Sequence, residues 1–230
     1  MSSRETASRS AIGSPPYRSV SVARWIAVGL VFLATGLVLG VTSSGDGIVP
    51  GDIAVARAIQ WPASPAIDSA ARVVSLIGDD FPGMVLLALL AAALLVFKGR
   101  RDLAVFVGLA AALRAVGPTL KNLAASPRPP SDLVAVLDEA AGSGYPSGHA
   151  LGAALLYGAI AIVAPEVVPN RLLVRSIQAV AVVMIVLTSL SRVRLGVHWP
   201  TDIAGGVLIG AGLLCLLRAA ALTVRGGSRT

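Results

Sequence analysis

The sequence predicts an all-α, polytopic membrane protein in which six transmembrane helices form a bundle. Apolar residues make up 55% of the 230 positions and charged residues only 13%, whereas about a quarter of the residues in soluble domains are charged. The mean hydropathy is +0.80, and six apolar runs approach the roughly 20 residues that cross a bilayer. This composition excludes a soluble globular domain and a disordered chain.

The six apolar runs follow one another and are separated by polar loops. The third run is interrupted by Arg114, and an ionisable residue inside a span is a functional hypothesis by default. Several runs are short, but flanking residues can extend a span because charged side chains near its ends snorkel outward. We expect the spans at residues 25–41, 81–97, 103–120, 150–165, 177–191 and 203–217.

The segments outside these spans complete the domain organisation. Residues 1–24 are rich in Ser, Arg and Pro and predict a disordered N-terminal tail. We assign residues 25–221 to the six-helix transmembrane domain, whose first span is an uncleaved anchor, and 222–230 to a C-terminal tail. Between the first and second spans, residues 53–59 and 66–77 are amphipathic, which favours two short helices lying on the membrane interface.

Basic residues divide unequally between the two sides of this arrangement. Twelve of the 19 Lys and Arg residues lie on the side of the two termini. The positive-inside rule therefore predicts a multi-pass plasma-membrane protein with both termini in the cytoplasm. The net charge of +7 then reports orientation and gives no reason to expect nucleic acid as a partner. Six cations lie on the extracytoplasmic side against this trend, which indicates that some of them have a local function.

Three segments, residues 121–129, 145–149 and 191–202, bring reactive side chains to that outer face. Arginine offers a planar fork of donors to phosphate oxygens, and lysine offers a point charge. Gly148 and His149 stand where a helix is expected to begin, so their backbone N–H groups attract anions. Ser147 adds a hydroxyl and is suited to cap that helix. The combination favours binding of a phosphate or another oxyanion.

The two histidines of the chain, His149 and His198, both lie in these segments. An imidazole can act as nucleophile, acid or base near neutral pH. Asp202 follows His198 by four residues and shares its face if the segment is helical, and a carboxylate on one ring nitrogen leaves the other free to attack. Two His and one Asp could also bind zinc or iron, but the surrounding cations disfavour a metal, and we expect no metal and no cofactor.

The three segments resemble the signature of the type 2 phosphatidic acid phosphatase family, which is K-x6-R-P, P-S-G-H and S-R-x5-H-x3-D. Residues 121–129, 146–149 and 191–202 match it without a gap or a substitution, and the six-span layout is similar to that of bacterial members. Soluble vanadium haloperoxidases share this site, but the apolar spans favour the membrane family.

The resemblance implies a metal-independent phosphatase that hydrolyses a lipid phosphate or pyrophosphate through a phosphohistidine. His198 would be the nucleophile and Asp202 would orient it. His149 would protonate the leaving oxygen and then activate water. The residues that would hold the phosphoryl oxygens are Lys121, Arg128, Ser147, Gly148 and Arg192.

The three motifs do not specify which lipid is the substrate. The Ala-, Gly- and Val-rich, Lys-poor composition is typical of a bacterium with a GC-rich genome, which favours a polyprenyl pyrophosphate or another polyprenyl-linked phosphate of the cell envelope. The alternatives are phosphatidylglycerol phosphate or phosphatidic acid as substrate, a phosphotransferase, and a lipid-binding or transport relative. Membrane lipids are expected partners, and Arg194 and Tyr145 are candidates for headgroup contacts. Arg114 either pairs within the bundle or lies below the phosphate-binding residues.

Overall fold

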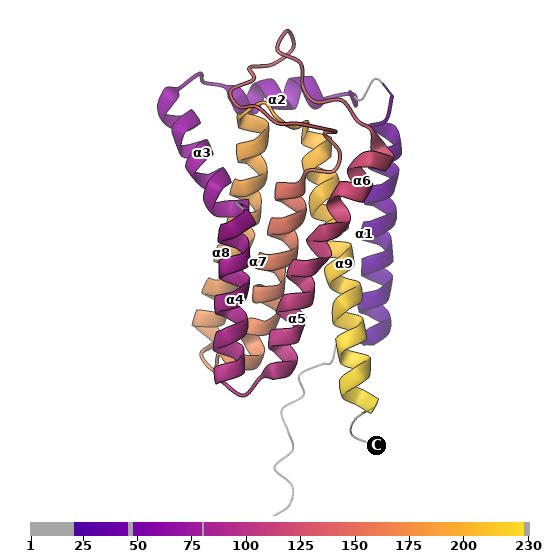
Figure 1. Cartoon of the computed structure of the whole chain (residues 1–230), viewed down its shortest axis with the longest axis vertical. Coiled ribbons are helices and arrows are strands. Elements are labelled where there is room, and N and C mark those ends of the chain that lie inside the picture. The colour runs from indigo at the N-terminus through magenta and orange to yellow at the C-terminus, as the bar shows by residue number, and fades with distance from the viewer. Residues whose placement is uncertain (1–20, 46–47, 80, 228–230) are drawn as a thin grey trace, which may run out of the picture.

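The computed structural model describes residues 21–45, 48–79 and 81–227, and this part of the chain is all-helical. The predicted fold class is therefore confirmed. Most of the predicted N-terminal tail lies outside the described residues. Long helices run side by side, and α2 lies across one end of them (Figure 1). The elements are α1 (Val22–Thr42), α2 (Asp52–Gln60), α3 (Pro65–Asp79), α4 (Phe81–Phe97), α5 (Arg101–Ala112), the 3-10 helix η1 (Leu113–Val116), α6 (Gly117–Ala124), α7 (Gly148–Val167), α8 (Arg171–Arg194) and α9 (Pro200–Gly227).

Five to six of these units are long and apolar enough to cross a bilayer. Five are α1, the combined helix Arg101–Ala124, α7, α8 and α9. The sixth requires α3 and α4 together, because α4 alone has 17 residues and the two helices meet at a bend of 47°. The chain is thus a multi-pass membrane protein. α8 and α9 extend well beyond the expected runs, because their charged ends are included in the helices.

The two predicted interfacial helices differ in the structure. α2 lies across the end of the bundle, as expected for a helix on the membrane surface, but α3 slopes down toward α4 and does not lie flat (Figure 1). Ala71 of α3 packs against Leu195 and Val197, and Asp68 forms an ion pair with Arg194 at 2.8 Å. The polar face of α3 is therefore satisfied by α8, and that contact holds the helix against the bundle.

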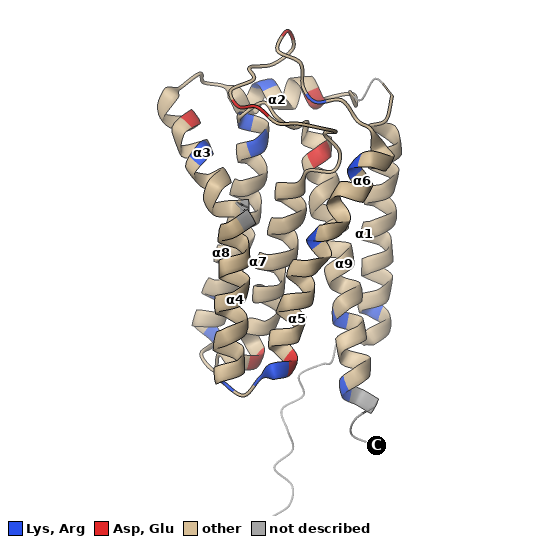
Figure 2. Cartoon of the chain, in the orientation of Figure 1, with Lys and Arg blue, Asp and Glu red and all other residues tan. Residues whose placement is uncertain are grey.

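The core is built around α7, the most buried of the long helices. Leu151, Leu155 and Leu156 are fully buried and form one cluster with Phe106 and Val107 of α5. Charged residues gather at the two ends of the bundle (Figure 2). At the end away from α2, Glu166 of α7 lies 2.8 Å from Arg100, Arg218 and Arg225. These ion pairs link α7 to the loop between α4 and α5 and to α9.

α1 and α9 approach each other closely through glycine. A Cβ atom at Gly212 would lie 2.9 Å from the backbone oxygen of Gly29 and 2.7 Å from Leu33. Small residues let membrane helices approach until their backbones are in contact, which strengthens packing where no hydrophobic drive exists between helices in lipid. This contact fixes the position of α9, whose first turn contains Asp202 of the third motif.

Candidate active site

The three motif segments meet at the end of the bundle that α2 covers. The loop after α6 carries Arg128 and returns to the start of α7, and the turn between α8 and α9 carries His198. The backbone N–H of Ser147 donates to the Asp202 carbonyl at 3.0 Å, and that of Gly144 donates to the Ser126 carbonyl at 2.8 Å. These bonds join segments that are distant in the sequence, so the expected proximity of the three motifs is present.

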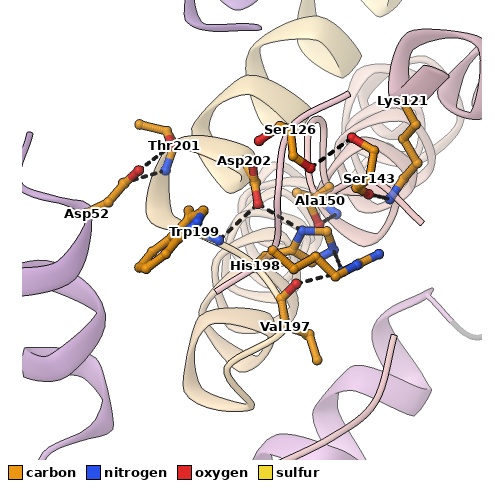
Figure 3. Close-up of polar contacts among 12 residues, drawn as sticks. Asp52, Lys121, Ser126, Ser143, Ala150, Val197, His198, Trp199, Thr201 and Asp202 are labelled. Carbon is orange, nitrogen blue, oxygen red and sulfur yellow. Dashed lines mark hydrogen bonds and ion pairs between the residues drawn. The ribbon is translucent and has the colours of Figure 1, made fainter. Parts of the chain in front are cut away.

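His198 and Asp202 form a buried pair. His198 Nδ1 lies 3.2 Å from Asp202 Oδ2, and the two side chains are 3% and 0% exposed (Figure 3). The same carboxylate oxygen accepts the backbone N–H of Trp199 at 2.9 Å. α9 begins only at Pro200, so the pair does not share a helix face. Instead, Asp202 reaches back from the first turn, as an acidic residue does in a capping box.

Asp202 contacts only one of the two ring nitrogens of His198. The tautomer with a proton on Nδ1 satisfies Asp202 and places a lone pair on Nε2. Arg128 Nη1 lies 3.4 Å from that nitrogen. Burial, followed by the charges of Arg128, Lys121 and Arg192, holds the pKa of His198 well below its ordinary value. His198 is therefore neutral at neutral pH, as a nucleophile must be.

Arg128 is held by backbone carbonyl groups. Nη1 donates to Val197 at 2.6 Å, Nη2 to Ala141 at 2.9 Å and Nε to Gly142 at 3.0 Å. Burial lowers the pKa of Arg128, but a guanidinium stays charged in proteins. The loop therefore fixes a cation beside the free nitrogen of His198, where phosphoryl oxygens would need it.

The other side chains predicted to bind phosphate are Lys121 of α6, Ser147 at the N-cap of α7 and Arg192 of α8. Lys121 Nζ donates to the Ser143 carbonyl at 2.9 Å. Ser147 caps α7, and its hydroxyl accepts the N–H of Ala150 at 3.4 Å. Arg192 is 7% exposed and donates to Ser75 Oγ at 2.7 Å. Gly148 and His149 form the first turn of α7, so the N-terminal N–H groups of that helix point toward the site.

A largely apolar cavity of about 640 Å³ leads away from this polar cluster. It runs between α4, α5, α6 and α7, and Lys121 and Gly148 stand at its polar end. Apolar side chains such as Leu89 and Leu156 form most of its wall, and Arg114 lines it as well. A second cavity of about 520 Å³ opens beside Arg128 and Val197. The cluster thus borders one apolar cavity within the bundle and a second cavity whose lining includes the charged residues Arg128, Asp138 and Glu139.

A family model for the PAP2 superfamily matches residues 84–225, which include all three motifs. The chain belongs to the PAP2 superfamily. It is therefore a membrane lipid phosphatase, and a lipid phosphate is its class of substrate.

Relatives of this PAP2 phosphatase act on different lipids. Decaprenylphosphoryl-5-phosphoribose phosphatase of Mycobacterium tuberculosis is 33% identical over 168 residues, which cover 70% of this chain and 85% of that protein. Phosphatidylglycerophosphatase B of Bacillus subtilis is 37% identical over 75 residues, 32% of this chain and 37% of that protein.

Two solved structures show the same fold. A transmembrane PAP2 type phosphatidylglycerolphosphate phosphatase from Bacillus subtilis superposes with a TM-score of 0.70 at 23% identity, covering 86% of this chain and 96% of that one. LpxE from Aquifex aeolicus superposes with a TM-score of 0.55 at 23% identity, covering 75% and 98%.

Two residues expected at the lipid headgroup are engaged elsewhere in this PAP2 protein. Arg194 is 5% exposed, and its guanidinium binds Asp68 and the carbonyls of Ile59 and Pro62. Tyr145 is 2% exposed and donates its hydroxyl to the Gly36 carbonyl. In both residues, these tertiary contacts occupy polar atoms that the sequence analysis assigned to a headgroup.

One residue near the site was missed by sequence reasoning. Asp52 of α2 is 3% exposed and accepts the N–H and the hydroxyl of Thr201, at 3.0 and 2.6 Å. Thr201 precedes Asp202, so Asp52 holds the first turn of α9 from the side of α2 (Figure 3). Burial raises the pKa of the Asp52 carboxyl. An acidic residue in an amphipathic helix gives no such signal in the sequence, because most of them face water.

Proposed function

We propose that this PAP2 phosphatase hydrolyses a polyprenyl-linked phosphate or pyrophosphate of the cell envelope through a phosphohistidine on His198. The observation that carries the proposal is the match to the decaprenylphosphoryl-5-phosphoribose phosphatase, which spans most of both chains. The apolar cavity beside Lys121 and Gly148 supports it, because a long hydrocarbon chain needs an apolar path that ends at the phosphate-binding residues.

The first chemical step breaks the bond between phosphorus and the leaving oxygen. Nε2 of His198 attacks phosphorus while Asp202 stabilises the charge that develops on the ring. His149 begins this step as imidazolium, gives one proton to the leaving oxygen and becomes neutral. The phosphoryl oxygens are held by Lys121, Arg128, Ser147, Gly148 and Arg192, and the fixed cations and N–H groups stabilise the transition state without further reorganisation.

The second step restores the enzyme. Water attacks the phosphorus of the phosphohistidine, the P–N bond breaks, and His149 accepts the proton of the water. Inorganic phosphate leaves, and His198 is again neutral. A metal ion is not required in this scheme, because the positive charge comes from side chains.

We further propose that the site faces the extracytoplasmic side. The site and α2 lie at one end of the bundle, and the loop between α4 and α5, with the far end of α9, lies at the other (Figure 1). Twelve of the 19 basic residues belong to the side of the termini, which the positive-inside rule places in the cytoplasm. Both ends of the chain would then be cytoplasmic, although the structure includes residues 222–227 of the expected C-terminal tail in α9.

The proposal is tested by phosphate release from lipids in detergent. The purified protein is offered a polyprenyl diphosphate, a polyprenylphosphoryl phosphoribose, phosphatidylglycerophosphate and phosphatidic acid, with and without EDTA and vanadate. We expect the highest kcat/KM for a polyprenyl substrate, undiminished by EDTA and inhibited by vanadate. His198→Ala should abolish release and His149→Ala nearly so. Full activity of His198→Ala would exclude the mechanism.

The matches to Bacillus subtilis phosphatidylglycerolphosphate phosphatases favour one second candidate, hydrolysis of phosphatidylglycerophosphate. A higher kcat/KM for that lipid than for both polyprenyl substrates selects it.

The same assay also identifies the other functional classes. A phosphorylated acceptor in place of inorganic phosphate among the products identifies a transferase. Binding of lipid without turnover identifies a binding or transport protein.

A further inference from the structure

Arg114 introduces a positive charge into the apolar cavity. Among the described residues that line this cavity, two carry a charge, Lys121 at the polar end and Arg114 further along it. The family motifs begin at Lys121 and do not include Arg114. A cation in a membrane-embedded apolar environment is costly, and such residues mark ligand or ion paths.

The local backbone explains how Arg114 comes to line the cavity. The helix between α5 and α6 tightens to the 3-10 turn η1, which contains Arg114. Pro118 stands four residues after Arg114 and cannot donate the helical bond to its carbonyl, so the regular α-helix is interrupted here. Arg114 precedes Lys121 by seven residues, about two turns or 10 Å of rise, and both line the same cavity.

We propose that Arg114 binds a second phosphate group of the substrate, one that lies between the scissile phosphate and the hydrocarbon chain. When the scissile phosphate lies at Lys121 and Gly148 and the chain occupies the cavity, the part of the substrate next to the phosphate passes Arg114. Guanidinium and phosphate oxygens form charge-assisted and often bidentate hydrogen bonds, which are about twice as strong as bonds between neutral groups. Arg114 would therefore be a residue that determines specificity.

This inference rests on the proposed function and narrows its substrate class. It favours lipids with two anionic phosphates, either a diphosphate, in which the inner phosphate remains on the chain, or a terminal phosphate joined to the lipid through a phosphodiester. It disfavours lipid monophosphates such as phosphatidic acid. Both kinds of lipid carry an inner phosphate anion. The experiment below distinguishes the inner phosphate of a diphosphate from that of a phosphodiester.

The test compares substrates that differ by the inner phosphate. One pair is a polyprenyl diphosphate and the monophosphate of the same chain. The other pair is phosphatidylglycerophosphate and phosphatidic acid with the same acyl chains. For each pair, the ratio of kcat/KM for the two-phosphate lipid to that for the monophosphate is measured in wild type, Arg114→Gln, Arg114→Lys and Arg171→Gln. Arg171 begins α8 at the opposite end of the bundle, so its substitution removes the same charge away from the cavity.

We expect Arg114→Gln to lower the ratio by about 10- to 100-fold, the cost of a charge-assisted hydrogen bond, in at least one pair. Arg114→Lys should lower it less, and Arg171→Gln should leave it unchanged. A loss confined to one pair identifies the diphosphate or the phosphodiester as the group that is bound. An unchanged ratio, or a wild type that prefers monophosphates, overturns the inference.

Failure of the proposed function gives a different result, because the wild type then releases phosphate from none of the four lipids or only from the two glycerophospholipids, whatever the effect of Arg114→Gln on the ratio. Thermal unfolding in detergent shows whether each variant is folded. If Arg114→Gln does not fold, Arg114→Lys supplies the test alone, because lysine keeps the charge but loses the two-pronged geometry; an unchanged ratio in that variant also overturns the inference.

Discussion

Asp202 accepts hydrogen bonds from His198 Nδ1 at 3.2 Å and from the backbone N–H of Trp199 at 2.9 Å through one carboxylate oxygen. The side chain that orients the proposed nucleophile thus also closes the first turn of α9. The position of His198 and the start of that helix are therefore coupled.

This coupling predicts the effect of Asp202→Asn. The amide can present its NH₂ group to the imidazole, which favours the tautomer with its proton on Nε2 and removes the nucleophilic lone pair. Loss of such an orienting partner costs at least about 100-fold in activity. We expect kcat for phosphate release to fall by this factor while the protein remains folded. A kcat within threefold of wild type would contradict the role of Asp202.

The bonds between Asp52 and Thr201 predict a positioning effect from α2. The two Thr201 donors bind different oxygens of Asp52, so Asp52→Asn replaces one of the two acceptors with an NH₂ group. Weakening bonds to a buried charged group in this way costs about 1–3 kcal/mol. We expect a lower unfolding temperature in detergent and a larger effect on kcat than on KM. In a double-mutant cycle, Thr201→Val should be non-additive with Asp52→Asn. Additive losses would show that the pair does not act as a unit.

The depressed pKa of His198 predicts how stability depends on pH. As pH falls below about 6.5, the unfolded imidazole takes up a proton, whereas the folded one stays neutral because its pKa is lowered. Folding is therefore destabilised by up to about 1.4 kcal/mol per pH unit as the pH falls below this value. This contribution of His198 is fully present above pH 6.5.

The measurement is the unfolding temperature in detergent at pH 7.5 and pH 5. His198→Asn removes the titrating ring, so its unfolding temperature should fall less between the two pH values than that of wild type. Equal decreases in the two proteins would contradict a lowered pKa at His198.

The close approach of α1 and α9 predicts that Gly212→Ala is destabilising. A methyl group there would lie 2.9 Å from the Gly29 carbonyl oxygen, and forcing extra volume into a packed contact costs about 1–3 kcal/mol. Gly108→Ala is the matched control, because nothing outside the adjacent residues and backbone of α5 lies within 4 Å of its Cβ position. We expect the first variant to unfold at a lower temperature and the second to be unchanged or slightly stabilised, since alanine favours helix.

Much of the architecture could be predicted from the sequence because the signals are local. Apolar runs of nearly spanning length give all-helical membrane topology directly. The spacing from Lys121 to Pro129 and from Ser191 to Asp202 gives the family, because each motif is contiguous. The contribution of α3 to the sixth span could not be read in this way, since a short amphipathic segment fits both an interfacial helix and a helix packed on a neighbour.

Partners that are distant in the sequence were decided only by the tertiary structure. The sequence by itself determined a multi-pass helical PAP2 protein with Lys, Arg, His and Asp gathered near one face. Packing decided that Arg194 binds Asp68, that Tyr145 binds the Gly36 carbonyl, that Asp52 holds Thr201 and that Arg114 lines an apolar cavity. The physical reason is that a polar side chain binds whichever donor or acceptor the packing of the helices brings within about 3 Å, and that neighbour is not specified by the local sequence.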